Sequence, residues 1–198
     1  MNPDSTTAAG FADPVLGAQH CFRALLEAMS RPGRVQTLGL GLAPPAPLGL
    51  AAAAVLLTLA DADTPVWHDA GPAVADWLRF HAGCLLVAEP AAAAFLLACG
   101  PPPALAALDS GTEEEPHRAA TLVIQVAALA PDREAGGAWR LTGPGIEHAH
   151  HLRVDGLPPG FAAAWAANHG RFPRGVDVVL CAGDRLAALP RTTRIEEG

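Results

Sequence analysis

The feature that most constrains this chain is the way glycine and proline interrupt its long apolar stretches. Residues 35–60 carry no charge and are more than long enough to span a membrane. Three prolines and three glycines divide this stretch into pieces that are too short to cross a bilayer, and Gly100-Pro101-Pro102-Pro103 divides residues 91–108 in the same way. The apolar segments are therefore expected to be buried elements of a folded domain.

Apolar periodicity predicts helices that alternate with strands. Spacings of three and four residues, together with helix-favouring residues, indicate helices at 14–29, 50–61, 72–82 and 158–168. Short apolar or β-branched runs indicate extended segments at 34–38, 64–67, 84–88, 121–128, 139–142, 176–181 and 186–189, and the second half of 91–99 is favoured as a strand. Residues 139–142 are expected to pair with 121–128, with a hairpin across 131–138. The predicted fold class is α/β, a single layered domain with a mixed β-sheet flanked by helices.

The first helix has a clear start and a clear apolar stripe. Asp13-Pro14 is typical of an N-cap followed by proline at the first helical position. The expected stripe that faces the core consists of Val15, Leu16, Phe22, Leu25, Leu26 and Met29. The domain is predicted to cover residues 11–194, with a flexible tail at 1–10 and a flexible end at 195–198.

Charge composition excludes several classes of function. Thirteen basic and twenty acidic residues give a net charge of −7 without a basic cluster, which disfavours a nucleic-acid-binding module. All thirteen basic residues are arginine, so the chain lacks the lysine that a pyridoxal Schiff base or a P-loop requires. The amino terminus carries acidic residues and no long apolar segment, which predicts a cytoplasmic location without a signal peptide.

Few residues form a pattern typical of catalysis. Cys21, Cys84, Cys99 and Cys181 lie far apart among apolar neighbours and are expected to be buried, reduced thiols. His148-Ala149-His150-His151 could bind a metal with Glu147 or Asp155 as a third ligand, but its position after a Gly-Pro-Gly turn favours a solvated loop. Asp61 and Asp63 could act as metal ligands or as a general base, although capping of backbone donors is the favoured role.

Arginines are frequent near the carboxyl end, at positions 171, 174, 185, 191 and 194. The planar guanidinium binds phosphate and carboxylate groups through two parallel hydrogen bonds. If these side chains converge, they would form an anion-binding or subunit-contact patch. If they do not, they are solvated surface residues, and both alternatives stay open.

Several strings, in the right order and spacing, resemble the PhnH family, the H subunit of the bacterial carbon-phosphorus lyase system. The first is Ala18-Gln19-His20-Cys21-Phe22-Arg23 with the following Leu25-Leu26, Ala28-Met29-Ser30 and Pro32-Gly33. The others are AAVLLTLADADTPVW at 53–67, Arg79-Phe80-His81, Ser110-Gly111-Thr112, Thr121-Leu122-Val123, RLTGPGI at 140–146, FPRGVD at 172–177 and PRTT at 190–193. Together they span about residues 11–194. The Glu113-Glu114-Glu115 run and the 148–151 histidines are not part of this pattern.

The resemblance implies an accessory subunit of ribose 1-methylphosphonate 5-triphosphate synthase, which transfers the ribose triphosphate moiety of ATP to methylphosphonate in phosphonate catabolism. The implied partners are subunits G, I and J, with L acting functionally, and the implied state of the isolated chain is a homodimer. The implied fold is similar to the large domain of pyridoxal-phosphate transferases without the cofactor. Two alternatives stay open: a subunit that contributes an anion-binding or active site at an interface, and a stand-alone small-molecule binding module.

The inventory of side chains predicts no autonomous catalytic residue, no cofactor and no metal. Candidate anion-binding residues are Arg140 and Thr142 with Gly143 and Gly145 in the turn that follows. An arginine and a hydroxyl beside a glycine turn could offer donors to a phosphate group. These four residues are the site prediction for the interface alternative.

Overall fold

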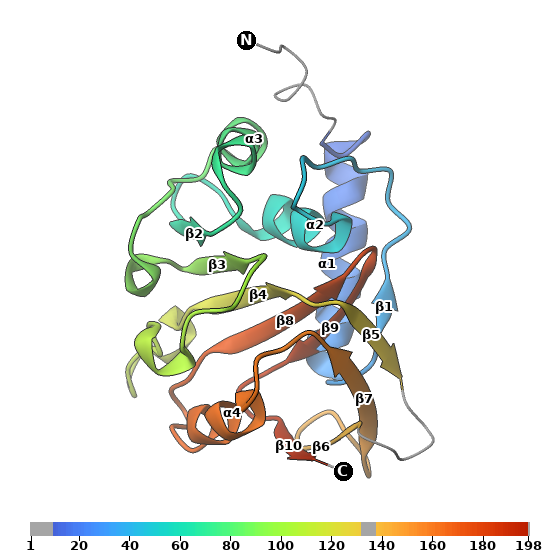
Figure 1. Ribbon diagram of the computed structural model, residues 1–198, viewed down its shortest axis with the longest axis vertical. Helices are drawn as coiled ribbons and strands as arrows, with labels where there is room; N and C mark the ends of the chain where they lie inside the picture. Colours follow the sequence, from blue (N-terminus) through green and yellow to red (C-terminus); the bar gives the residue numbers. More distant parts are fainter. Residues whose placement is uncertain (1–9, 132–137, 198) are drawn as a thin grey trace.

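A computed structural model describes residues 10–131 and 138–197 (Figure 1). The chain forms two β-sheets with helices packed against them, which confirms the α/β class and the presence of a mixed sheet flanked by helices. The expectation of one sheet was wrong, because the described strands divide into a six-stranded and a four-stranded sheet. No helix in the described ranges is both long and apolar enough to cross a membrane.

The six-stranded sheet has the order β1-β9-β8-β4-β3-β2. Its strands are β1 (Gln36–Thr37), β2 (Val66–His68), β3 (Phe95–Ala98), β4 (Thr121–Gln125), β8 (Asp177–Ala182) and β9 (Arg185–Leu189). Strands β2, β3, β4 and β8 are parallel, β9 is antiparallel to β8, and the edge strand β1 is antiparallel to β9. The parallel strands are continuous apolar runs because both faces of this sheet are covered.

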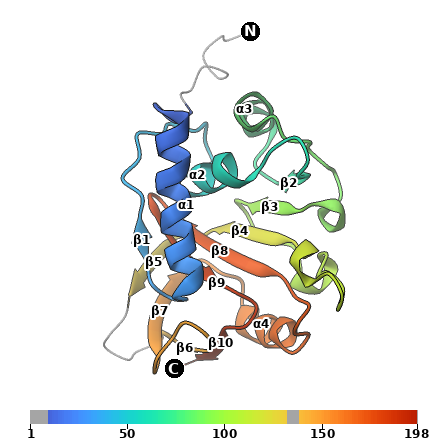
Figure 2. The same ribbon diagram turned by 180° about the vertical axis from the view of Figure 1, so that it is seen from behind.

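Helices α1 (Pro14–Ser30), α2 (Leu50–Leu59) and α3 (Pro72–Ala82) lie over one side of this sheet (Figure 2). The core on that side includes Cys21, the alanines of α2 and Val123 of β4. The opposite side is covered by α4 (Phe161–His169) and the second sheet, and there the core includes Leu122, Ile124 and Trp165. Alternate residues of β4 therefore enter the two cores, as the period of a strand requires. The described residues also form three short 3₁₀ helices: η1 (Pro90–Ala92), η2 (Leu105–Ala107) and η3 (Pro116–Arg118).

The second sheet is antiparallel and has the order β10-β6-β7-β5. It consists of β5 (Ala128–Pro131), β6 (Trp139–Thr142), β7 (His150–Asp155) and β10 (Arg194–Glu197). The predicted pairing of 139–142 with 121–128 was wrong, because β6 pairs with β7 and β10 while β4 is enclosed between β3 and β8. The predicted hairpin turn lies largely outside the described residues, and its flanking strands β5 and β6 each pair with β7. Residues 195–197, expected in a flexible end, belong to β10.

Local signals succeeded where they were strongest. The Asp13 carboxylate accepts hydrogen bonds from the backbone N–H groups of Val15 and Leu16, which confirms the N-cap. Helix α3 has the predicted bounds, and the second half of 91–99 is strand β3. The predicted strand at 84–88 was wrong: this segment makes one isolated bridge, between Leu86 and Val66, and Leu85 is exposed. A single bridge leaves most of its backbone unpaired with the sheet.

The orientation of α1 differs from the expectation. Its buried residues are Gly17, Cys21, Leu25 and Ala28, whereas Val15, Leu16, Phe22 and Leu26 are exposed. Small side chains face the sheet and α2 because the helix packs closely there, and large apolar side chains remain on the outer surface. The predicted core stripe was therefore wrong except at Leu25, which is buried, and at Met29, which is partly buried against the core.

Candidate functional site: a hollow lined by arginines and histidines

Two adjoining hollows are lined by the turn after α1 and by the start of β7 and the residues before it, and the larger also includes residues of β1 and β5. Figure 1 shows where these strands lie. The larger, about 560 Å³, is lined by Gly33, Arg34, Val35, Gln36, Pro131, Ala149, His150 and His151. The smaller, about 410 Å³, is lined by Arg31, Arg34, Gly145, Glu147, His148, Ala149 and His150. Since they share Arg34, Ala149 and His150, we treat them as one feature, the cationic hollow.

The turn after α1 forms one wall of the cationic hollow. Gly33 has a φ of +83°, and a Cβ atom at this position would lie 2.6 Å from Cδ1 of Leu141. Only glycine therefore allows the turn to approach the second sheet this closely. The Pro32 carbonyl oxygen lies 2.6 Å from Nδ1 of His150. Because a carbonyl can only accept, Nδ1 carries the proton, and the imidazole of β7 is tied to the end of α1.

Gly145, of the Gly143-Pro144-Gly145 turn, also lines the cationic hollow. Gly145 has a φ of +81°, and a Cβ atom there would overlap the carbonyl oxygen of Ser30. The turn thus packs directly against the last residue of α1. This contact brings Gly145 to the cationic hollow beside Arg31 and Arg34.

The charges of the cationic hollow are unevenly balanced. Nη1 of Arg31 donates to Oε1 of Glu27 at 2.7 Å, and Nη1 of Arg34 lies 3.7 Å from the same oxygen. Two guanidinium groups therefore share one carboxylate. Glu147, the acidic residue of the lining, is almost fully exposed and lies 3.8 Å from His148 Nε2.

The four residues predicted as an anion site are only partly at this location. Gly145 lines the cationic hollow, but Arg140 donates from Nη1 to Oε2 of Glu196 on the neighbouring strand at 2.7 Å. Thr142 lies opposite Arg194 in the register of β6 and β10. Gly143 packs against the carbonyl oxygen of Thr192. Sequence reasoning missed Arg31 and Arg34, whose only signal was their position beside Pro32-Gly33 at the end of the first helix.

The histidine cluster does not form the expected solvated loop throughout. His150 and His151 begin strand β7, so the loop interpretation was wrong for these two residues. His148 lies before the strand and is exposed. Within residues 10–131 and 138–197, no group of three His, Cys, Asp or Glu side chains is placed to hold a metal ion. The alternative of a metal site thus finds no ligand set in the described part of the chain.

Asp61 and Asp63 follow the capping interpretation. The Asp61 carboxylate accepts from the backbone N–H of Asp63 and from the Thr64 hydroxyl, both at 3.0 Å. The Thr64 oxygen in turn accepts from the backbone N–H of Asp61 at 2.7 Å. This loop satisfies its own donors after α2, as expected for aspartate and threonine at a turn.

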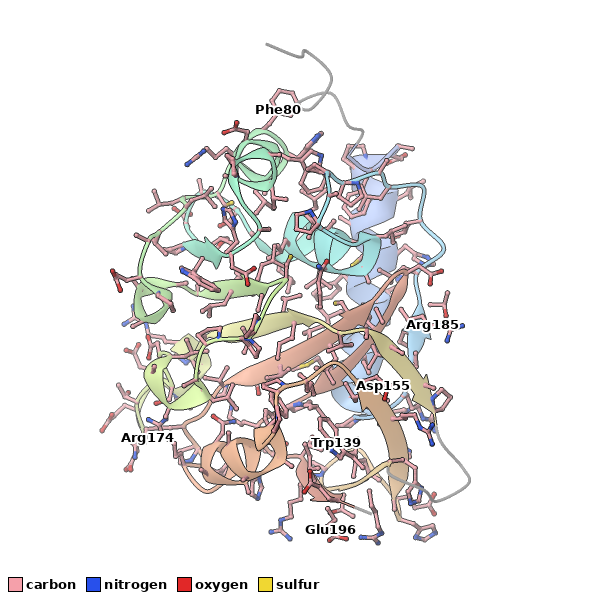
Figure 3. All side chains as sticks on the ribbon, viewed as in Figure 1. Phe80, Trp139, Asp155, Arg174, Arg185 and Glu196 are labelled. Atoms are coloured by element: carbon pink, nitrogen blue, oxygen red, sulfur yellow. The ribbon has the colours of Figure 1, made fainter. Side chains whose placement is uncertain are left out.

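The arginines near the carboxyl end do not converge into one patch. Arg174 and Arg185 lie on opposite sides of the molecule (Figure 3). Arg171 donates to the Ser110 hydroxyl, and Arg194 donates to the His169 ring. Arg191 forms a mostly buried ion pair with Asp177 at 2.5 Å, and it also donates to the Pro116 carbonyl. Since these contacts are internal, the anion-patch alternative is not supported for the group as a whole.

The carboxyl edge of the parallel strands is the usual ligand site of α/β folds. In this protein the polar side chains at that edge form hydrogen bonds with the protein's own backbone. The Asp69 carboxylate accepts from the backbone N–H groups of Cys99 and Gly100 at 2.7 and 2.8 Å. The Gln125 amide accepts from Gly49 N–H, at the start of α2, and donates to the Pro47 carbonyl. A cavity of only about 120 Å³ remains beside Gln125, small for a ligand site.

The thiols are held in their neutral form by burial. Cys21, Cys84 and Cys181 are buried, whereas Cys99 is half-buried, so the expectation of four buried thiols was wrong at Cys99. Burial raises the pKa of all four thiols. Desolvation, with a smaller contribution from the Asp69 carboxylate, raises the pKa of Cys99 to about 12. A thiol with such a pKa is almost entirely protonated at neutral pH.

Cys99 is therefore expected to react slowly with Ellman's reagent in the folded protein at pH 8, and all four thiols are expected to react rapidly in urea. Because folding raises the pKa of Cys99, its protonated form favours the native state. That contribution to stability is complete below the unfolded thiol's pKa, near 8.5, and is lost as pH rises toward about 12. Reaction of native Cys99 at pH 8 as fast as in urea would contradict this prediction.

The amino-acid sequence is similar to known proteins over nearly its full length. Residues 9–196 match the model of the family described as bacterial phosphonate metabolism protein (PhnH). The chain belongs to the PhnH family. It is 42% identical over 193 residues to alpha-D-ribose 1-methylphosphonate 5-triphosphate synthase subunit PhnH of Rhizobium meliloti, covering 94% of each protein. It is also 37% identical over 177 residues to the putative C-P lyase subunit protein HtxG of Stutzerimonas stutzeri, covering 89% of this chain and 85% of that protein.

PhnH membership confirms the family resemblance found in the sequence. The family match begins just before α1 and ends within β10, so it includes both sheets and the cationic hollow. The similarity is therefore not confined to one motif or one layer of the fold.

Proposed function

We propose that this PhnH-family chain is an accessory subunit of a ribose 1-methylphosphonate 5-triphosphate synthase, acting in phosphonate catabolism. The observation that carries the proposal is the 42% identity with a named subunit of that synthase across nearly the full length of both proteins. The second relative is named as a subunit of C-P lyase, which agrees with the same process.

The chemistry of the side chains supports an accessory role. The thiols have raised pKa values, and the chain has no lysine. Asp61, Asp69 and Asp177 are each engaged in internal hydrogen bonds that stabilise loops or strand ends. Nucleophiles and bases in these states contribute little to group transfer without other subunits. The partners in the proposed complex are subunits G, I and J, with L acting functionally, in the cytoplasm.

The fold agrees with a further part of the proposal, similarity to the large domain of pyridoxal-phosphate transferases without the cofactor. Four adjacent strands of the larger sheet are parallel. Gln125 and Asp69 close the edge where such folds bind ligands. The lack of lysine is consistent with a chain that does not hold pyridoxal covalently.

We also propose that the isolated chain forms a homodimer through α1. One face of α1 carries residues at spacings of four, three and four, the spacing found along the seam of a coiled coil. These residues, the α1 seam, are Val15, Gln19, Phe22 and Leu26. Figure 2 shows this helix along the outside of the molecule. In an antiparallel pair of α1 helices, Val15 would face Leu26 of the second copy and Gln19 would face Phe22. The seam is thus complementary to itself, as a two-fold interface requires.

The proposed role is tested by reconstitution with ATP and methylphosphonate. The isolated chain is expected to release no adenine, and the G, I, J and L subunits without it are expected to release at least about tenfold less than the complete set, a difference of about 1.4 kcal/mol in the barrier. Chromatography of the mixture shows whether the chain enters the complex. Adenine release by the chain alone, or full activity of the other subunits without it, would contradict the accessory role.

A further inference from the structure

We infer that the cationic hollow binds the phosphate chain of an oligophosphate. The inference rests on the arrangement of Arg31, Arg34 and His150 around a concave surface of suitable size. It does not depend on the proposed assembly, because the binding groups all belong to one chain.

The first argument is the local charge. The protein has a net charge of −7, yet two of its arginines and three of its eight histidines line the cationic hollow. The Glu27 carboxylate lies near both guanidinium groups, and the same oxygen, Oε1, is the one nearest to each of them. Of the residues that the structure describes, Glu147 is the one acidic residue of the lining itself, and Glu27 lies beside the lining. Guanidinium groups therefore outnumber carboxylates in the lining, which favours an anionic ligand there against an acidic background.

The second argument is the supply of hydrogen-bond donors. Each guanidinium has five N–H groups arranged for bidentate binding of phosphate. Among the described residues, Arg31 uses Nη1 in one side-chain hydrogen bond, to Glu27, whereas Arg34 approaches the same oxygen only at 3.7 Å. Most of their donors can therefore bind an anion while the contacts with Glu27 persist.

The third argument is shape and access. Volumes of about 560 and 410 Å³ both lie within the range of small-molecule sites. The side chains of Arg31 and Arg34 are 51% and 50% exposed, so a ligand reaches them without opening the fold. By contrast, the side chain of Arg191 is only 13% exposed and is bonded on several sides. Arg31 and Arg34 therefore line a concave surface and are also accessible to a ligand, whereas Arg191 is not.

The fourth argument is a rigid frame. The hydrogen bond between His150 and Pro32 joins β7 to the turn after α1, and Gly145 packs against Ser30. Backbone segments from three parts of the chain therefore hold the arginines near the histidines before any ligand binds. A site that is already formed loses less conformational entropy on binding.

Calorimetric titration of the purified chain with inorganic triphosphate tests the inference. Wild-type protein is expected to bind, and Arg34→Gln is expected to weaken binding about tenfold or more, which corresponds to about 1.4 kcal/mol. Arg34→Lys, which keeps the charge but loses the planar fork, is expected to lie between them. Arg118→Gln is the matched control, because Arg118 is also exposed and pairs with Glu115 outside the hollow. Thermal unfolding verifies that each variant is folded.

Titrations with ATP and adenosine identify the part of the ligand that is bound. ATP is expected to bind about as tightly as triphosphate, and adenosine is expected not to bind, because the lining recognises phosphate oxygens. Preference for ATP by more than about tenfold would instead indicate a nucleotide site and overturn recognition of the phosphate chain alone. The inference is also overturned if triphosphate does not bind, or if folded Arg34→Gln binds like the wild type. Equal weakening by Arg118→Gln would likewise overturn it. These measurements use the isolated chain, so failure here leaves the reconstitution result unaffected.

Discussion

Replacing Arg191 with methionine is expected to lower the free energy of unfolding by about 3–5 kcal/mol. The Arg191 side chain donates from Nε and Nη2 to the two oxygens of Asp177, and from Nη1 to the Pro116 carbonyl. The side chains of Arg191 and Asp177 are only 13% and 16% exposed. Methionine fills a similar volume but leaves the Asp177 carboxylate without its charged partner in a place where water is scarce.

Urea denaturation of three variants measures this effect. Arg185→Met is the matched control, because Arg185 is exposed on β9, and it is expected to change stability by less than about 0.5 kcal/mol. Adding Asp177→Asn to Arg191→Met is expected to recover part of the loss, since the unpaired charge is then removed. A loss below about 1 kcal/mol for Arg191→Met would show that the ion pair does not stabilise this end of β8 as proposed.

Replacing both Phe22 and Leu26 with glutamate is expected to convert the proposed homodimer to a monomer. The two side chains are 49% and 56% exposed in the single chain, so the fold itself loses little packing. In the antiparallel arrangement, the four new carboxylates would be buried without partners. We expect dissociation to become at least about a hundredfold more favourable, which corresponds to about 2.7 kcal/mol.

Light scattering and sedimentation measure the mass of each variant. Phe80→Glu is the matched control, because Phe80 is a large apolar residue that is 70% exposed on a different helix, α3 (Figure 3). It is expected to leave the dimer intact. A double variant that remains dimeric would rule out the α1 seam as the contact. Wild-type protein that is monomeric would rule out the homodimer, and loss of the double variant from the reconstituted complex would then assign the seam to another subunit.

Local chemistry explains which predictions from the sequence succeeded. Asp13 and Pro14 start α1 because their capping effects depend only on adjacent backbone groups. Asp61 and Thr64 bond within one turn for the same reason. The family resemblance also succeeded, because the order of many short strings does not require knowledge of their contacts.

The candidate site was less predictable because its parts are distant in sequence. Arg34 and His150 meet only when the turn after α1 packs beside β7. Arg140 looked equally suitable as an anion ligand, and it is the antiparallel pairing of β6 with β10 that places Glu196 beside it. Distances of this kind depend on sheet pairing, which no local pattern specifies.

The sequence by itself determined the α/β class, the positions of most helices and strands, and the family. These properties follow from periodicity, capping and composition, which act over a few residues. Only the tertiary structure decided that there are two sheets, that the large apolar residues of α1 point outward, and that Arg31, Arg34 and His150 line one hollow. The physical reason is that an apolar stripe shows that a surface favours burial, whereas its partner is selected by packing and strand pairing across the whole chain.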